Sequence, residues 1–434
     1  MNLSTYLMNG EFRTRQLSSF QPVVDSLDHD VLYNQPTSVI AKFLSRFGKA
    51  LTKELLNEDG VLYLASWLRE SNLQHYLELN LNDPAVLDEF VKSPSAKEQL
   101  YLRAQPRGVV CHWVAGNVPT LAIFSLVQSI LTKNVNILRV PQDTMEGVLR
   151  ILKVLGSVQV EHEGRTLHGQ DVLKTIAAVY YPSSDSRLNT SMSMIADCKV
   201  IWGGKEAVRD IIALPQREHC ENIVFGPKYS FSVADEESMN EATCRRLAMD
   251  VISFEQNACS SPHVLFGQTS NDATMEAARR VATKMAAAFQ ETSPKYPKQS
   301  NKYSAILNAR GRYLLDPRKE LIHSKELDWT ILINKEIELE APVGARTRYV
   351  KGVSSASELL PLITNKIQTV GVAFEEISDE LQFCEQATRR GVARCVSIGT
   401  MNNYDAPWDG ILYINRLVRW TAYRTTTVKE KTYA

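Results

Sequence analysis

From residue 107 onward the chain alternates short apolar runs with amphipathic segments. The run 108–114 is rich in valine, as a strand would be, and the segment 120–131 places Leu121, Phe124, Val127 and Leu131 on one face of a helix. The pattern then repeats. Further strands are predicted at 136–140, 175–181, 199–204 and 229–234, and a helix at 205–214. Strands that alternate with helices predict parallel, doubly wound sheets.

The first hundred residues have a helical pattern instead. Apolar residues recur every three or four positions in 40–47 and in the set Val61, Leu64, Ala65 and Leu68. A second strand-and-helix series starts at residue 229, with Asp235 as the expected N-cap of the next helix. A chain of 434 residues is too long for one hydrophobic core.

We therefore expect an α/β protein with two doubly wound domains. The first domain would cover 1–225, including a helix-rich part at 1–100, and the second domain would cover 226–404. The segment 405–434 would return to the first domain or lie at a subunit interface. Aromatic, apolar tails of this kind usually pack against a neighbouring domain or subunit, and we expect a homo-oligomer.

Composition narrows the functional classes. The 49 basic and 49 acidic residues balance, so nothing favours nucleic acid or an anionic membrane as partner. The apolar stretch 109–131 is interrupted by His112, Asn117 and Pro119, so we interpret it as a buried strand, turn and helix rather than a membrane span. The N-terminus shows no signal-peptide pattern. The seven cysteines have no regular spacing, which predicts neither disulfides nor a metal cluster and favours a reducing, cytoplasmic setting.

Cys259 stands out among these cysteines. It lies between a predicted helix at 241–253 and an apolar strand at 264–266, just before a Ser-Ser-Pro turn. A cysteine at such a break is suited to act as a nucleophile, and a thiol can carry an acyl group as a thioester. Glu255 and His263 flank it, but a histidine beyond this turn need not face the thiol.

Five segments, in order, resemble the aldehyde dehydrogenase superfamily. They are 105–110 with 116–119, 136–141, 201–206, 224–228 and 257–259. The segments His-Trp-Val-Ala-Gly-Asn-Val-Pro (112–119) and Asn-Ala-Cys-Ser-Ser-Pro (257–262) are similar to those of the LuxC-type acyl-CoA reductases, the fatty-acid reductases of bacterial luminescence. The resemblance covers residues from about 100 to about 430 and weakens before them.

The resemblance implies roles for particular residues. Cys259 would attack an acyl thioester, and the Asn117 side chain with the Cys259 backbone N–H would stabilise the oxyanion. Asn117 also suits a plain turn before Val-Pro. Phe124, Gln256 and Asn257 are candidates for the substrate pocket. The apolar face that includes Phe124 is equally compatible with core packing.

The resemblance also implies a nicotinamide cofactor, which the domain at 1–225 would bind, while the domain at 226–404 would be the catalytic domain that carries Cys259. Arg139 would stand near the adenosine, where its guanidinium suits a 2′-phosphate, so NADPH is expected, with NADH as the other option. Gly203 and Gly204 would allow the backbone close to the pyrophosphate, ahead of a helix that begins at Lys205. Trp113 is a further cofactor-binding candidate. No metal is expected.

Val224 is the informative departure from the family pattern. Aldehyde-oxidising members have a glutamate there as general base, and valine cannot accept a proton. We therefore expect reduction of an acyl-CoA or acyl-carrier thioester with a fatty acyl group to the aldehyde, with an acyl-transferase or acyl-activating protein as a further partner. The alternatives are a non-redox cysteine acyltransferase, an acyl-phosphate reductase and an idle scaffold.

Overall fold

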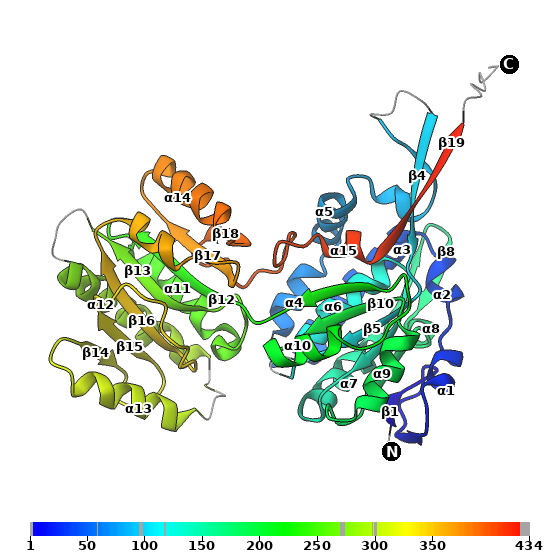
Figure 1. Ribbon diagram of the computed structural model, residues 1–434, viewed down its shortest axis with the longest axis horizontal. Helices are drawn as coiled ribbons and strands as arrows, with labels where there is room; N and C mark the ends of the chain where they lie inside the picture. The colour runs from blue at the N-terminus through cyan, green and yellow to red at the C-terminus, as the bar shows by residue number, and fades with distance from the viewer. Residues whose placement is uncertain are drawn as a thin grey trace. The chain divides into compact units, whose positions relative to one another are not determined.

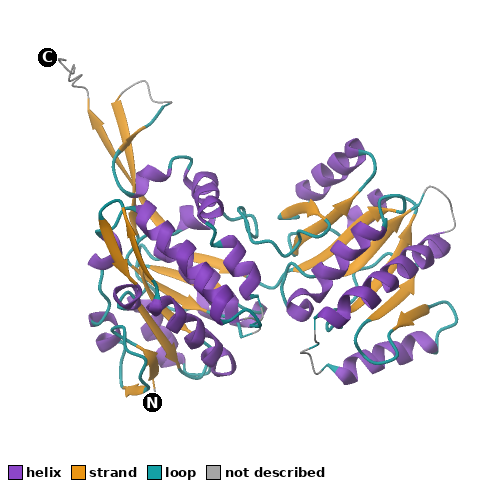
Figure 2. Cartoon of the chain, turned by 180° about the vertical axis from the view of Figure 1, so that it is seen from behind, coloured by secondary structure: helices purple, strands orange, loops and turns teal. Residues whose placement is uncertain are grey.

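The chain forms two compact units. The computed structural model describes residues 3–58, 60–94, 99–116, 119–269, 274–296, 298 and 302–425. Unit 1 comprises Met1–Gly226 and Ile411–Ala434, and unit 2 comprises Pro227–Gly410 (Figure 1). Each unit contains a seven-stranded sheet with helices packed against it (Figure 2). The predicted α/β class is confirmed.

The sheet of unit 1 is mostly parallel. Its order is β11-β10-β5-β6-β9-β1-β2. The strands are β1 (Leu3–Leu7), β2 (Arg15–Leu17), β5 (Val109–Trp113), β6 (Val135–Arg139), β9 (Ile176–Tyr180), β10 (Cys198–Trp202) and β11 (Glu221–Phe225). Strands β11 to β9 run parallel, whereas β1 pairs antiparallel with both β9 and β2. The helical pattern of the first hundred residues did not predict the strands β1 and β2 at the edge of this sheet, because β1 is stabilised by pairing with β9, which is far away in the sequence.

Helices surround this sheet. They are α1 (Gln21–Asp25), α2 (Asp30–Tyr33), α3 (Thr37–Glu54), α4 (Val61–Trp67), α5 (Glu70–Leu81), α6 (Pro119–Leu131), α7 (Gln142–Ser157), α8 (Gly169–Leu173), α9 (Ser186–Ile195), α10 (Lys205–Ile212) and α15 (Tyr413–Arg416), with a 3₁₀ turn η1 (Pro84–Leu87). The apolar α6 is buried along almost its whole length. Among the described residues, no helix has both the length and the apolar character needed to cross a membrane.

A buried polar network links α15 to the sheet of unit 1. The ring of His112 contacts the Ser125 hydroxyl (2.8 Å) and the Asn136 side-chain oxygen (3.0 Å). The Ser125 hydroxyl also contacts the Tyr413 hydroxyl at 2.8 Å. Burial lowers the pKa of His112 to about 4, so this histidine is neutral at neutral pH. The last part of the chain is thus fixed to unit 1 by hydrogen bonds.

Two smaller sheets complete unit 1. Strands β3 (Val91–Lys92), β4 (Gln99–Pro106) and β19 (Val418–Thr425) form an antiparallel sheet, and β7 (Gln159–His162) pairs with β8 (Arg165–His168). The long strands β4 and β19 lie side by side along their whole length (Figure 1).

Unit 2 has a second, mostly parallel sheet of order β14-β15-β16-β13-β12-β17-β18. The strands are β12 (Tyr229–Asp235), β13 (Pro262–Gln268), β14 (Glu320–His323), β15 (Thr330–Asn334), β16 (Thr347–Val353), β17 (Ile367–Ala373) and β18 (Arg394–Ser397). Only the edge strand β14 is antiparallel to its neighbour. The central strands carry apolar side chains on both faces of the sheet, because helices cover both faces.

Each face of this sheet packs against its own helices. Helices α11 (Glu241–Ile252) and α12 (Thr274–Thr292) cover one face, and α13 (Tyr303–Leu314), α14 (Ile377–Arg389) and the 3₁₀ turn η4 (Ala356–Leu362) cover the other. Further 3₁₀ turns are η2 (Ser253–Gln256) and η3 (Ser293–Lys295). Within each central strand, neighbouring side chains therefore enter two different cores.

The predicted N-cap of α11 is wrong. The Asn240 side chain accepts the capping hydrogen bond from the Thr243 N–H at 3.0 Å. Asp235 ends β12 instead, and its carboxylate accepts hydrogen bonds from the N–H groups of Ser238 (2.7 Å) and Glu375 (2.6 Å). The loop between β12 and α11 separates the residue that ends the strand from the residue that caps the helix. Strand and helix periodicity did not reveal the length of this loop.

Candidate active site

Three consecutive residues ahead of Cys259 have left-handed backbone conformations. The φ angles of Phe254, Glu255 and Gln256 are 56°, 49° and 58°. None of the three is glycine, and this conformation costs a residue with a side chain roughly 1–2 kcal/mol. Such strain persists only where surrounding contacts enforce it, and it is concentrated at functional sites. The turn η2 therefore redirects the chain sharply between α11 and Cys259.

A buried ion pair holds this turn. The Arg346 guanidinium donates to the Glu255 carboxylate through two nitrogens, at 3.1 and 2.6 Å, and to the Tyr296 carbonyl at 2.8 Å. The Ala345 N–H donates to the Glu255 carbonyl at 3.2 Å. Ala345 and Arg346 also have positive φ angles, 51° and 63°. Two strained segments, distant in sequence, thus hold one another in place.

Hydrogen bonds also anchor the backbone at Cys259. The Ser230 hydroxyl, on β12, donates to the Cys259 carbonyl at 2.6 Å and accepts from the Thr369 N–H of β17 at 3.1 Å. The next residue, Ser260, donates to the Asn402 side-chain oxygen at 2.8 Å. The cysteine is therefore fixed to two central strands and to the segment that follows β18. Cys259 as a whole residue is partly exposed, although its sulfur is buried.

The thiol of Cys259 is poorly ionised within unit 2. Burial of the sulfur raises its pKa to about 12, and the negative charge of Asp409 adds to the rise. The Arg394 guanidinium and the backbone N–H groups of Cys259 and Ser260 act in the opposite direction. Because the thiolate is the nucleophile, the balance between these groups determines reactivity.

The two pocket candidates beside Cys259 differ in exposure. The Gln256 side chain is buried, and its amide donates to the Pro262 carbonyl at 3.1 Å. Asn257 is exposed, and its oxygen accepts from the Lys302 ammonium at 3.1 Å. Gln256 therefore stabilises the turn, while Asn257 presents a polar surface next to the cysteine. Their contact with substrate stays a prediction.

His263 does not pair with the thiol in the part of the chain that the structure describes. Its ring lies 5.3 Å from the Tyr229 ring, and burial lowers its pKa to about 4. A neutral, buried histidine on β13 is suited to packing. Asn117, the expected oxyanion donor, lies outside the described residues.

The cofactor candidates lie at one edge of the unit 1 sheet. Trp113 and Arg139 are the last residues of β5 and β6 and are paired in register, and Gly203 follows the adjacent strand β10. The carboxyl ends of parallel strands are where nucleotides bind in such sheets. Gly204 is the N-cap of α10, and Lys205 is its first residue. The structure thus brings these five residues to the same edge.

These residues differ in exposure and in their hydrogen-bond partners. Arg139 donates to the Tyr181 carbonyl at 3.0 Å, and its guanidinium lies 5.5 Å from the Tyr181 ring centroid. A side-chain carbon at Gly204 would meet no atom within 4 Å, so the turn is open. Trp113 is buried and donates to the Asn189 oxygen at 3.3 Å.

Phe124, the third pocket candidate, is buried in unit 1. It is 6% exposed, and its ring lies 5.3 Å from the ring of Trp67. This environment is that of a core residue, which was the alternative interpretation of the apolar face of its helix. A role in substrate binding stays a prediction.

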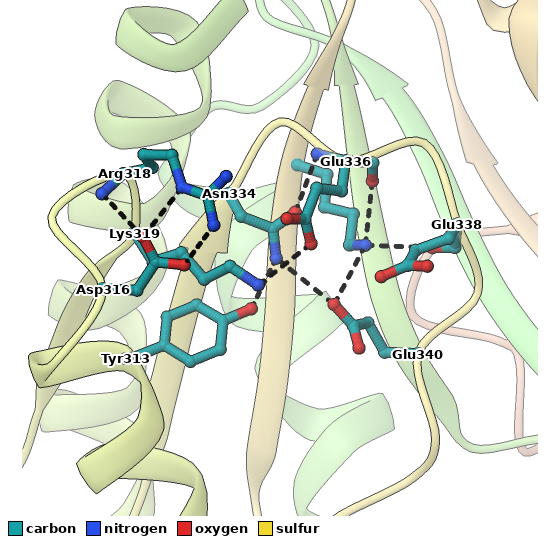
Figure 3. Close-up of polar contacts among 9 residues, drawn as sticks. Tyr313, Asp316, Arg318, Lys319, Asn334, Glu336, Glu338 and Glu340 are labelled. Carbon is teal, nitrogen blue, oxygen red and sulfur yellow. Dashed lines mark hydrogen bonds and ion pairs between the residues drawn. The ribbon is translucent and has the colours of Figure 1, made fainter.

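An acidic cluster in unit 2 surrounds a buried lysine. The carboxylates of Glu336, Glu338 and Glu340 offer ligand atoms within 4.8 Å of one another. The Lys351 ammonium donates to the Glu336 carbonyl (2.9 Å), the Glu338 carbonyl (3.1 Å) and the Glu340 carboxylate (3.3 Å). Figure 3 labels the three glutamates of this loop. Lys351 thus pairs with the Glu340 carboxylate, and Lys319 pairs with the Glu336 carboxylate at 3.0 Å, so two of the three carboxylates already have a cationic partner.

Sequence reasoning missed the groups that surround the thiol. Arg394 interrupts an apolar strand, and Asp409 follows Trp408 in a segment that was interpreted as a packing tail. A lone charge inside the run Val-Ala-Arg-Cys-Val was the available signal, since charged residues are rarely buried without a role. The contact of this strand with the cysteine turn could not be read from the sequence.

Solved aldehyde dehydrogenases share the fold. The NADP-dependent glyceraldehyde-3-phosphate dehydrogenase of Bacillus halodurans C-125, complexed with NADP, matches with a TM-score of 0.65 at 11% identity, over 98% of this chain and 95% of that chain. Betaine aldehyde dehydrogenase from Staphylococcus aureus, in complex with NAD+, matches with a TM-score of 0.63 at 12% identity, over 100% and 94% of the two chains. The fold is therefore that of the aldehyde dehydrogenases.

The sequence defines the family within that fold. The family model described as "Acyl-CoA reductase (LuxC)" matches residues 38–420, and the chain belongs to this family of oxidoreductases. It is similar to the long-chain acyl-protein thioester reductases of Aliivibrio fischeri (25% identical over 374 residues) and Vibrio harveyi (26% over 368). Each alignment covers 83% of this chain and 73% of the relative. The predicted LuxC-type resemblance is confirmed.

Proposed function

We propose that this protein reduces a long-chain acyl thioester to the aldehyde through an acyl group carried on Cys259. The observation that carries the proposal is the position of Cys259, which follows a strained turn and is anchored to β12 through Ser230. Membership of the acyl-CoA reductase family supports the reaction class. Relatives named long-chain acyl-protein thioester reductases support a fatty acyl substrate.

The residues of the chain would act in sequence. The Cys259 thiolate forms a bond to the thioester carbonyl carbon, and the donor thiolate leaves and takes a proton. The Cys259 backbone N–H and the Asn117 amide would stabilise the oxyanion of each tetrahedral stage. Val224 has no group that accepts a proton, so it would not activate water against the acyl-enzyme. The acyl group would then survive until it is reduced.

The cofactor proposed is NADPH, with NADH as the alternative. When bound, it supplies the hydride that converts the thioester carbonyl to the aldehyde level. The residues present fit such a group. Gly204 leaves open space ahead of α10, and the buried Nε of Arg139 has no hydrogen-bond partner among the described residues. Arg139 would face the 2′-phosphate, with Gly203 and Lys205 near the pyrophosphate and Trp113 behind them.

The acyl donor would be acyl-CoA or an acylated carrier. Relatives bear the name acyl-protein thioester reductase, which supports delivery by a partner protein that transfers or activates the acyl group. We propose a homo-oligomer as the working state. In such an assembly the aromatic residues near the C-terminus, such as Trp420, which is 39% exposed, would be covered.

The test is intact-protein mass spectrometry with a panel of acyl-CoAs, followed by NADPH. The wild type should gain the mass of one acyl group and lose it on NADPH addition as aldehyde forms. The Cys259→Ala variant should gain nothing, and the Cys384→Ser control, at a partly exposed cysteine on α14, should behave as wild type.

Other outcomes would redirect the proposal. Label that NADPH does not discharge, but that an amine or thiol does, would indicate an acyltransferase. Labelling by acyl phosphate alone would indicate an acyl-phosphate reductase. The absence of labelling with every donor would point to an idle scaffold and would overturn the role of Cys259.

A further inference from the structure

A buried arginine lies in the strand next to the cysteine turn. Arg394 begins β18, where it is paired in register with Thr369 of β17. The residue is 8% exposed, and its guanidinium lies 4.7 Å from the ring centroid of Trp408. Its Nη1 is buried and has no hydrogen-bond partner among the described residues. A buried cation with an unused donor requires an anionic neighbour to offset its desolvation.

The hydrogen-bond network connects this strand pair to Cys259. Thr369 donates its N–H to Ser230, which in turn donates to the Cys259 carbonyl. On the other side, Ser260 donates to Asn402, in the segment between β18 and Trp408. The positive charge of Arg394 lowers the pKa of the Cys259 thiol. The cation therefore belongs to the surroundings of the thiol.

Asp409 is the opposing charge in this region. It has a left-handed backbone (φ 52°), and its Oδ1 is buried without a hydrogen-bond partner in the described part of the chain. Burial raises the pKa of this carboxyl, while Lys228, Gln368 and Arg394 lower it. Among the charged neighbours of Arg394, Asp405 has the largest effect on its pKa, ahead of Asp409 and Tyr404.

We propose that Arg394 is a positioning residue that stabilises the thiolate of Cys259, and that ionised Asp409 opposes it. This inference rests on the proposed role of Cys259 as the nucleophile. In a site of low dielectric constant, one nearby charge changes the stability of a thiolate strongly. When the Asp409 carboxyl is neutral, the guanidinium acts on the sulfur without competition. When it is ionised, the proton is retained on the thiol.

The test is the rate at which iodoacetamide alkylates Cys259, measured by peptide mass spectrometry from about pH 6 to about pH 10. In this reaction the sulfur–carbon bond forms and iodide leaves, and only the thiolate reacts at a useful rate. Arg394→Gln should slow alkylation about tenfold at each pH, and Asp409→Asn should accelerate it by a similar factor, because a shift of one pKa unit changes the thiolate fraction about tenfold. Arg394→Lys should fall between Arg394→Gln and the wild type.

Opposite changes in the alkylation rate of the two variants distinguish an electrostatic effect from damage to the fold, because damage would not depend on the sign of the charge removed. Arg390→Gln, at an exposed arginine after α14, is the matched control and should alkylate as wild type. If Arg394→Gln and Asp409→Asn both slow or both accelerate alkylation, the proposal is wrong. If acyl-CoA does not label Cys259 but the two variants still change the alkylation rate in opposite directions, the proposed function is wrong. The electrostatic effect of Arg394 and Asp409 on the thiol would still be confirmed.

Discussion

The Arg346 guanidinium donates two hydrogen bonds to one carboxylate oxygen of Glu255, and both residues have left-handed backbone conformations. The side chains are 2% and 11% exposed. Both donors converge on one oxygen of Glu255, and the other carboxylate oxygen is buried without a hydrogen-bond partner among the described residues, so the pair offsets only part of the cost of its removal from water. It holds the strained turn that leads to Cys259.

We predict that Arg346→Met lowers the free energy of unfolding by about 3–5 kcal/mol, because it leaves the Glu255 carboxylate buried without its partner. Urea denaturation measures this loss. The control is Arg318→Met, which removes an ion pair with Asp316 whose arginine is 78% exposed, and it should change stability far less. Equal losses in the two variants would show that the buried pair does not hold the turn.

We predict that Gln256→Gly is more stable than Gln256→Ala by about 1 kcal/mol. Both variants lose the hydrogen bond to Pro262, but only glycine adopts a φ of 58° without steric cost. Denaturation of the two variants side by side gives the difference. At Gln382, an exposed position in α14, the order should reverse, since glycine is the poorer residue inside a helix.

We predict that His112 contributes a loss of stability as the pH drops from about 6.5 to about 4, whereas Asp250, whose pKa burial raises to about 7, contributes with the opposite sign. Burial lowers the pKa of His112 from 6.5 to about 4, so in this range the unfolded chain binds a proton that the folded chain does not. His263 contributes with the same sign, since its pKa is also lowered to about 4.

Replacing His112 should flatten this dependence. Between about pH 7 and about pH 5, His112→Gln should lose about 2 kcal/mol less stability than the wild type, from unfolding measured at both pH values. His75→Gln, at an exposed position of α5, should keep the wild-type slope. A slope unchanged in His112→Gln would mean that this histidine is already protonated in the fold.

We predict that Arg139→Gln weakens NADPH binding about tenfold to a hundredfold and leaves NADH binding nearly unchanged. The reason is loss of a charged donor to the 2′-phosphate, which NADH lacks. Fluorescence titration gives both dissociation constants, with Arg150→Gln, on the exposed surface of α7, as the control. Equal weakening for both cofactors would assign Arg139 a role away from the 2′-phosphate.

Much of the fold was predictable because its signal is local. The alternation of strands and helices from β5 onward, and the end of α11 just before Cys259, follow from periodicity within short windows. The edge strand β1 and the cap of α11 were not predicted correctly. Their partners, β9 and Thr243, are determined by pairing and loop geometry rather than by apolar pattern.

The sequence by itself determined the family, the α/β fold and the proposed nucleophile, Cys259, because ordered motifs and apolar periodicity are properties of neighbouring residues. Only the tertiary structure decided how that cysteine is held. Arg346 donates to Glu255, and the charges of Asp409 and Arg394 shift the pKa of the thiol, from positions far along the chain. Burial, charge pairing and backbone strain arise from contacts that folding creates, so no local pattern records them.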